Sequence, residues 1–198
     1  MSPMSITNVY FVRHAEPNYE NHNDQLRELT DTGMADRALV TEFLSDKQIH
    51  AVLSSPYKRS VDTVKEFADR NNLPIELIDD FRERKIDSVW IEDFNAFATQ
   101  QWTDFTYKLS DGECLQEVQD RNINALRQAL AKYRGKNIVI GSHGTALSTV
   151  INYYDNSFGY SDFQEIKKLM PWIVHFCFED DTCIKFEKHN LFSETAKY

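Results

Sequence analysis

The strongest constraint on the fold of this chain is a layout that occurs three times along the sequence. A short apolar run ends directly in polar or cationic residues at VYFV-RHAE (residues 9–16), HAVL-SSPYKR (residues 50–59) and NIVI-GSHGT (residues 137–145). Short apolar runs of this composition are typical of strands that are buried on both faces of a sheet. Each run therefore predicts a buried strand whose end carries polar side chains.

Helical patterns alternate with these predicted strands, and the alternation indicates the fold class. Residues 29–47 carry apolar positions at helical spacing, with Thr30 or Thr32 as the N-cap. Residues 113–133 show the same spacing and are followed by Gly135, a suitable C-cap. Strands that alternate with helices predict an α/β sandwich built on a mostly parallel sheet.

Two segments depart from this alternation. Near the end of the chain, WIVHFCF and TCIKFEK flank an acidic turn and predict an antiparallel hairpin. Residues 84–111 show no strand pattern and predict a mainly helical insertion that forms a lid over the carboxyl end of the sheet. We expect most aromatic rings of this insertion to pack it against the body, while Trp90 or Trp102 is a candidate contact for a ring-containing leaving group. The six aromatic residues are Trp90, Phe94, Phe97, Trp102, Phe105 and Tyr107.

The cationic groups that follow the predicted strands define a candidate anion site. Ligands of open α/β sheets bind beyond the carboxyl ends of the strands, so Arg13, His14, Arg59 and His143 are expected to converge there. Guanidinium groups match phosphate oxygens with paired, charge-assisted hydrogen bonds. The glycines of GSHGT allow close backbone approach, and the helix that follows presents its positive end. A phosphate ester fits two arginines better than a carboxylate does.

The motifs RHAEP, LTDTG, SSPYKRSVDT, FRER and GSHGT, taken in this order, resemble those of the phosphoglycerate-mutase-like histidine phosphatase superfamily. The resemblance spans roughly residues 9 to 146. It implies a three-layer α/β/α sandwich. Because Gly144 follows His143, where acid phosphatases and phytases of the superfamily have aspartate, the chain resembles the mutase-type branch.

The resemblance also implies a role for each matched residue. His14 would be the nucleophile that becomes phosphorylated, and Arg13, Arg59 and His143 would bind the phosphoryl group. Glu83, within FRER, falls where the family has its proton donor. The chemistry agrees with these roles, because a neutral imidazole can attack phosphorus and surrounding cations stabilise the charge on the phosphoryl oxygens. The resemblance implies no metal at this site.

The segment after RHAEP departs from the family pattern. Ala15 stands where glycine is common and is small enough to preserve close backbone approach. Many relatives have asparagine six residues after the nucleophile, where this chain has Glu20. Asn18 and Asn21 bracket that position, and either could contact phosphate.

Composition narrows the class of partner. The 22 basic and 31 acidic residues give a formal net charge of −9, which argues against nucleic acid or an anionic membrane as the partner. A small phosphorylated metabolite remains compatible, because it experiences the local field of a pocket. We expect one domain over residues 1–198, with the insertion at about 84–111 as its lid. The sequence does not indicate an oligomeric state.

Cysteine and histidine patterns indicate reduced thiols and no cofactor. The three cysteines include no C-x-x-C pair, and the six histidines form neither H-E-x-x-H nor a close Cys/His spacing. Residues 1–8 lack the pattern of a signal peptide, and no run approaches the roughly 18 apolar residues of a membrane span. A cytoplasmic location is therefore expected.

Three functions fit these residues. The first is a phosphatase that hydrolyses a small phosphomonoester through a phosphohistidine, acting as a phosphoric monoester hydrolase. The second is a 2,3-bisphosphoglycerate-dependent phosphoglycerate mutase, which uses the same residues but must retain and reorient its intermediate. The third is a catalytically inactive protein that binds a phosphorylated ligand. The short chain and the brief insertion favour the phosphatase.

Overall fold

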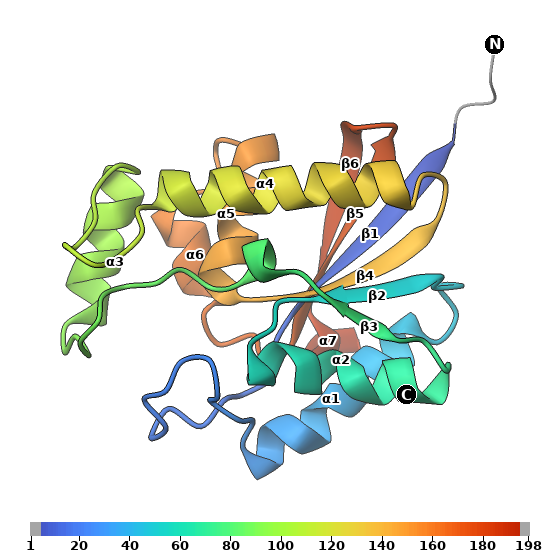
Figure 1. Ribbon diagram of the computed structural model, residues 1–198, viewed down its shortest axis with the longest axis horizontal. Helices are drawn as coiled ribbons and strands as arrows, with labels where there is room; N and C mark the ends of the chain where they lie inside the picture. Colours follow the sequence, from blue (N-terminus) through green and yellow to red (C-terminus); the bar gives the residue numbers. More distant parts are fainter. Residues whose placement is uncertain (1–4, 195–198) are drawn as a thin grey trace.

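The strand order of the sheet brings the three predicted strand ends side by side. The computed structural model describes residues 5–194, within which six strands pair in the order β3-β2-β4-β1-β5-β6 (Figure 1). The strands are β1 Ile6–Arg13, β2 Ala51–Ser54, β3 Ile75–Leu77, β4 Asn137–Ser142, β5 Trp172–Glu179 and β6 Thr182–His189. The helices are α1 Asp31–Leu44, α2 Lys58–Arg70, the 3-10 turn η1 Asp79–Phe81, α3 Phe94–Thr103, α4 Leu115–Lys132, α5 Gly144–Tyr154, α6 Tyr160–Ile166 and α7 Leu191–Glu194.

The register of the parallel strands aligns their carboxyl ends. β1 and β2 both pair with β4 in parallel, so that Arg13 lies opposite Ser142 and Ser54 lies opposite Gly141. β3 extends the parallel part beside β2. On the other side, β5 runs antiparallel to β1, and β6 forms a hairpin with β5. The predicted mostly parallel sheet and the predicted hairpin are confirmed.

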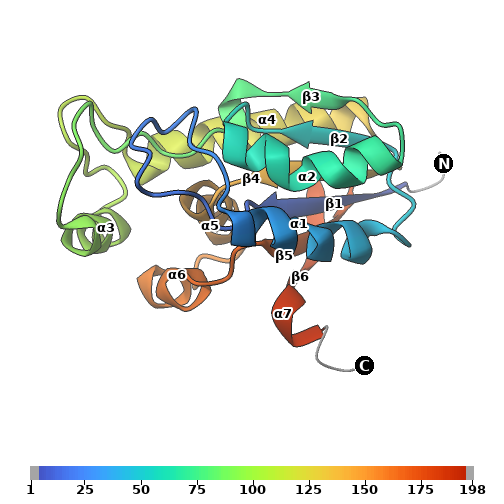
Figure 2. The same ribbon diagram turned by 90° about the horizontal axis from the view of Figure 1, so that it is seen from below.

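Helices cover both faces of the sheet, because side chains alternate along the central strand. Val9 and Phe11 belong to the apolar cluster that includes α4 and α5. Tyr10 and Val12 belong to the cluster formed with α1 and α2. Figures 1 and 2 show α4 and α5 on one side of the strands and α1 and α2 on the other. The predicted α/β/α sandwich is therefore confirmed.

Local signals explain where several helices begin and end. Thr30, one of the two predicted N-caps, accepts a hydrogen bond from the amide of Gly33 at the start of α1. Gly135 has a φ of 72° just beyond α4, a backbone conformation that suits glycine.

The insertion at residues 84–111 is less helical than its sequence predicted. Only α3 is helical there, and irregular chain precedes and follows it. Trp102 is buried against Phe105, Phe158 and Phe163, as expected of an aromatic residue that packs the insertion against the body. The sequence also gave no signal for α6, which packs against α3 and α5.

None of the described helices is long and apolar enough to cross a membrane. Residues 1–4, which form part of the segment considered for a signal peptide, and residues 195–198 lie outside the described residues.

Candidate active site

The aligned strand ends bring two of the predicted histidines into contact. His14 follows β1 and His143 follows β4, and their ring centroids lie 5.3 Å apart in an edge-to-face arrangement. The strand pairing continues past the strands themselves, since the amide of His14 donates to the carbonyl of Ser142 at 3.2 Å. Both rings are buried. The predicted convergence of these two histidines at this edge of the sheet is therefore observed.

The hydrogen bonds of His14 define its tautomer. Nδ1 lies 2.8 Å from the carbonyl oxygen of Ala15, and a carbonyl can only accept, so Nδ1 carries the proton. The Ala15 amide in turn donates to the hydroxyl of Thr63 at 2.9 Å, which fixes this turn of the chain against α2. The lone pair of His14 is consequently on Nε2. This is the atom that a neutral imidazole would use as a nucleophile.

His143 is held by the segment that follows β2. Its Nε2 lies 2.7 Å from the hydroxyl of Ser55, and the ring of Tyr57 packs edge-on against it at 5.3 Å. The buried Nδ1 of His143 has no hydrogen-bond partner among residues 5–194. Buried polar atoms are usually paired, so this nitrogen indicates a place for a ligand.

Burial and neighbouring cations keep both rings neutral. Burial, followed by the charges of Arg59 and Arg13, holds the pKa of His14 well below its usual 6.5. Burial, followed by Arg59 and His14, does the same for the pKa of His143. Each charge that opposes protonation of these rings is itself a group that attracts an anion.

The guanidinium of Arg13 lies next to Gly144, the first residue of α5. Its Nη1 donates to the carbonyl oxygens of Ile166 at 2.6 Å and Leu169 at 3.3 Å, and burial lowers its pKa. A Cβ atom on Gly144 would lie only 3.0 Å from this guanidinium, so the glycine of GSHGT permits the contact. The buried Nε of Arg13 has no hydrogen-bond partner within the described part of the chain.

The guanidinium of Arg59, in the first turn of α2, forms an ion pair with a carboxylate from another segment. The loop at residues 17–29 places Asp24 against it, with Nη2 of Arg59 2.9 Å from Oδ1 and Nη1 bonded to the Asp24 carbonyl. The same Oδ1 accepts from Arg27 at 3.0 Å. Both arginines are buried, and the charge of Arg27 also lowers the pKa of His14. Asp24 thus binds where an anionic ligand would be attracted.

Glu83 follows η1 and reaches the amino end of α5. Its carboxylate accepts the amides of Thr145 at 3.0 Å, Ala146 at 2.9 Å and Arg84 at 2.8 Å. The guanidinium of Arg84 points elsewhere, to Gln101 and the rings of Phe94 and Phe97, and Arg82 pairs with Asp79 and Glu113. Glu83 therefore binds the backbone of α5 directly after His143, at Thr145 and Ala146. Its charge also acts on Arg13.

Sequence reasoning missed several residues of this site. Arg27 and Asp24 lie outside every motif, and Ser55 lies within SSPYKR without having been assigned a role. Only the fold shows that Ser55 bonds His143 and that Asp24 bonds both Arg27 and Arg59. Asn18 and Asn21 both donate to the carboxylate of Glu28, at 2.7 Å each, so in this structure their amides bind a side chain of the loop. The one His/Cys/Asp/Glu group with metal-ligand spacing among residues 5–194 lies elsewhere, on β5 and β6.

Comparisons with known proteins agree with this geometry. A family model described as the histidine phosphatase superfamily (branch 1) matches residues 9–184. A Bacillus subtilis (strain 168) protein named uncharacterized phosphatase PhoE is 27% identical over 154 residues, covering 74% of this chain and 76% of its own. An Arabidopsis thaliana protein named metal-independent phosphoserine phosphatase is 27% identical over 163 residues, with 73% and 67% covered.

A solved structure shows the same fold. The phosphoserine phosphatase of Entamoeba histolytica, in complex with 3-phosphoglyceric acid, superposes with a TM-score of 0.75 at 18% identity. The match covers 93% of this chain and 98% of that one.

We predict that the imidazoles of His14 and His143 are both neutral at about pH 6 in the ligand-free protein, since each pKa lies well below 6.5. Nitrogen-15 NMR of the histidine rings measures this directly. Added phosphate should raise both midpoints, because a bound anion favours the charged ring. A midpoint at or above 6.5 for either ring without ligand would contradict the prediction.

The same pKa shifts have a consequence for stability. Between the folded-state pKa and 6.5 the unfolded chain binds a proton that the folded chain does not, so the free energy of unfolding falls as the pH drops below 6.5. Each ring contributes up to about 1.4 kcal/mol per pH unit in that window.

We predict that Asp24→Asn lowers KM for a phosphomonoester by roughly two- to fivefold, because it removes the negative charge that competes for Arg59 and Arg27. The effect is modest because Asp24 is 40% exposed, and such ion pairs contribute about 1 kcal/mol or less. Steady-state kinetics measures KM, with Asp69→Asn, an exposed carboxylate near the end of α2, as the control. A raised KM would instead mean that Asp24 positions Arg59 for substrate.

Proposed function

The chain belongs to the histidine phosphatase superfamily (branch 1) and is a phosphoric monoester hydrolase, and from this premise we propose that it acts through a phosphohistidine formed on His14. One observation carries the proposal: the buried His14 ring is neutral, its Nδ1 proton is bound by Ala15, and its Nε2 lone pair remains among cationic side chains. A neutral imidazole in this state is a competent nucleophile.

The unpartnered polar atoms of the site support binding of a phosphoryl group. Nε–H of Arg13 is buried without an acceptor in the described residues, and a phosphoryl oxygen would supply one. Nδ1 of His143 is likewise unpartnered there, and it would donate to a second oxygen in the tautomer whose Nε2 accepts from Ser55. Arg59 would exchange the carboxylate of Asp24 for the substrate. These charges would stabilise the three equatorial oxygens of the transition state, where phosphoryl transfer concentrates negative charge.

The proposed reaction has two steps. Nε2 of His14 attacks phosphorus while the bond from phosphorus to the ester oxygen breaks, and Glu83, which enters this step as the carboxylic acid, donates its proton to the departing alkoxide. Water then attacks the phosphohistidine as the bond from phosphorus to Nε2 breaks, and Glu83, now a carboxylate, takes a proton from that water. Inorganic phosphate leaves with neutral His14 and protonated Glu83 regenerated. The amides of Thr145 and Ala146 hold the carboxyl group of Glu83 at the amino end of α5 throughout.

A small phosphorylated metabolite is the proposed substrate, and a cytoplasmic location is proposed with it. The named relatives are phosphatases, which favours hydrolysis over mutase activity. One relative is named for phosphoserine, and one structural neighbour holds 3-phosphoglyceric acid, so small phosphomonoesters that also carry a carboxylate are the first compounds to assay.

We propose that residues 84–111 act as a lid within one domain. The exposed indole of Trp90 stacks on the ring of His22 at 4.1 Å with an interplanar angle of 3°. This contact joins the insertion to the loop at residues 17–29, which carries Asp24. Displacement of Asp24 by substrate and movement of the insertion would therefore be coupled through these two rings.

We predict that His14→Ala lowers kcat/KM by on the order of 10³-fold or more, because it removes the nucleophile. The measurement is release of phosphate from an aryl phosphate, with His50→Ala, an exposed histidine at the opposite end of β2, as the control. Wild-type protein quenched during turnover should carry acid-labile phosphate that the variant lacks. Activity of His14→Ala within tenfold of wild type would rule out the phosphohistidine.

We predict that Glu83→Gln separates substrates by their leaving group. Turnover of an alkyl phosphate should fall by about 10²–10⁴-fold, the usual scale of general acid catalysis, whereas a nitrophenyl phosphate should lose far less because its leaving group departs without a proton. Rates of both substrates with wild type and variant give the test. Equal losses for the two substrates would assign Glu83 a positioning role instead.

A further inference from the structure

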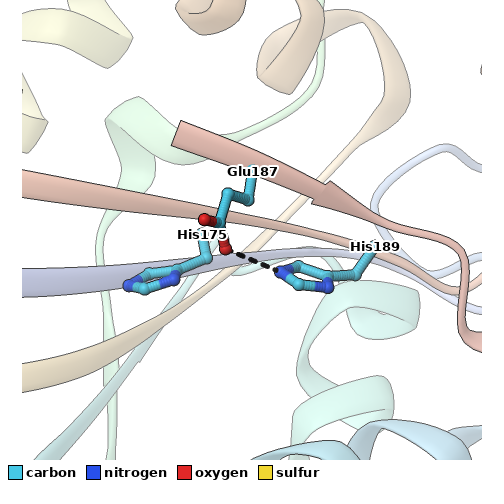
Figure 3. A group of neighbouring side chains, drawn as sticks. All are labelled: His175, Glu187 and His189. Atoms are coloured by element: carbon cyan, nitrogen blue, oxygen red, sulfur yellow. Dashed lines mark ion pairs between the residues drawn. The ribbon is translucent and has the colours of Figure 1, made fainter. Parts of the chain in front are cut away.

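A second group of chemically active side chains lies on the β5–β6 hairpin, away from the strand ends. His175 of β5 pairs in register with Glu187 of β6, and His189 follows Glu187 by two residues on the same face. One ligand atom from each residue lies within 4.8 Å of the others, and Glu187 Oε2 is 3.9 Å from His189 Nε2. Figure 3 shows the carboxylate of Glu187 between the two rings.

The group borders a cavity on the face of the sheet that α1 covers. The cavity has a volume of ≈ 370 Å³, which leaves room for an ion and its water ligands. Its walls are the hairpin group together with Tyr10 of β1 and two residues near the end of α1, Phe43 and Lys47.

The neighbours of His175 prepare one ring nitrogen for coordination. Nε2 lies 2.8 Å from Oδ1 of Asn8, whose own amide nitrogen donates to Asn137, so Nε2 carries the proton and Nδ1 has the lone pair. Stacking on Tyr10 at 4.3 Å fixes the plane of the ring. Histidines that bind metals usually donate their second N–H to such an acceptor.

Two lysines oppose a cation here, and each is engaged by a carboxylate. Lys47 pairs with Asp46 at 2.7 Å and lies over the ring of Phe43. Lys185 pairs with Glu187 at 3.4 Å, and both of these side chains are more than half exposed. Exposed pairs of this kind are weak, so a metal ion would displace Lys185 from Glu187 at small cost.

We propose that His175, Glu187 and His189 bind a divalent transition-metal ion, with Zn²⁺ as the best fit. Two imidazoles and one carboxylate are a common zinc-ligand set, in which water takes the fourth position. Bonds of about 2.0–2.1 Å place tetrahedral ligand atoms about 3.3 Å apart, so the group needs to close by roughly 1.5 Å or less. The exposed side chain of Glu187 can make most of that movement.

A metal ion at this site would stabilise the edge of the sheet. β6 is the terminal strand, and a metal bound by β5 and β6 together would cross-link it to its neighbour. A ligand that binds only the folded state raises the thermal midpoint in proportion to the logarithm of its concentration. None of the three ligands belongs to the phosphate site, so the inference does not depend on the proposed function.

The test uses full-length protein without an affinity tag, stripped with EDTA. Competition with a chromophoric chelator should show one equivalent of Zn²⁺ bound, and Co²⁺ should give the intense visible absorption of a four-coordinate site. Zn²⁺ should also raise the thermal midpoint. Glu187→Gln and His189→Gln should each weaken Zn²⁺ binding at least tenfold, whereas Glu165→Gln, an exposed carboxylate on α6, should bind as wild type does.

A further variant tests whether the positive charge of Lys185 opposes metal binding. Lys185→Gln removes the ammonium that pairs with Glu187 and should tighten Zn²⁺ binding by roughly two- to fivefold, on the scale of an exposed ion pair. Absence of saturable Zn²⁺ or Co²⁺ binding to the wild type would overturn the proposal. Equal affinity of wild type, Glu187→Gln and His189→Gln would overturn it as well.

Discussion

The alignment of three parallel strand ends is the constraint on which the rest of the site depends. The β-ladder continues one residue past the strands, since His14 donates to the carbonyl of Ser142 and Ser55 donates to that of Gly141. This backbone pairing places Ser55 within hydrogen-bond distance of His143, and His143 against His14. A shift of one strand by one residue would turn its side chains to the other face of the sheet and separate the group. Backbone hydrogen bonds, rather than contacts between the clustered side chains, therefore determine the geometry.

The charges of the site follow from the same arrangement. Arginines packed around two buried imidazoles keep those rings neutral, and in doing so they leave positive charge without a matching anion. The protein balances part of that charge with Asp24, which bonds both Arg59 and Arg27. A phosphoryl group carries more negative charge than one carboxylate and offers more acceptor oxygens, so it is the better partner for these arginines. The His14 ring is consequently neutral in the ligand-free protein, and under the proposed mechanism the anion that replaces Asp24 is also the one that this ring attacks.

The fold and the main residues of the site could be predicted because their signals are local. Alternating apolar runs and helical patterns give the sandwich, and the residues directly after each strand must lie at the same sheet edge. Asp24 and Arg27 could not be predicted this way, since they lie in an irregular loop whose path depends on Asn18 and Asn21 binding Glu28. The insertion was predicted to be mainly helical because it shows no strand pattern, but in the structure only α3 is helical and the rest of the segment is irregular chain.

No local sequence pattern marks the group of His175, Glu187 and His189, for a related reason. Its ligands come from two strands, and only the register that pairs His175 with Glu187 brings them together. β1 contributes residues to both groups, on opposite faces of the sheet. Tyr10 faces α1 and stacks on His175, while Arg13, three residues later, faces the opposite side and contacts Gly144 of α5. Because successive side chains of a strand alternate between faces, the sheet itself separates the two groups. A metal ion on the hairpin would therefore link β6 to β5 and leave the group around His14 chemically untouched.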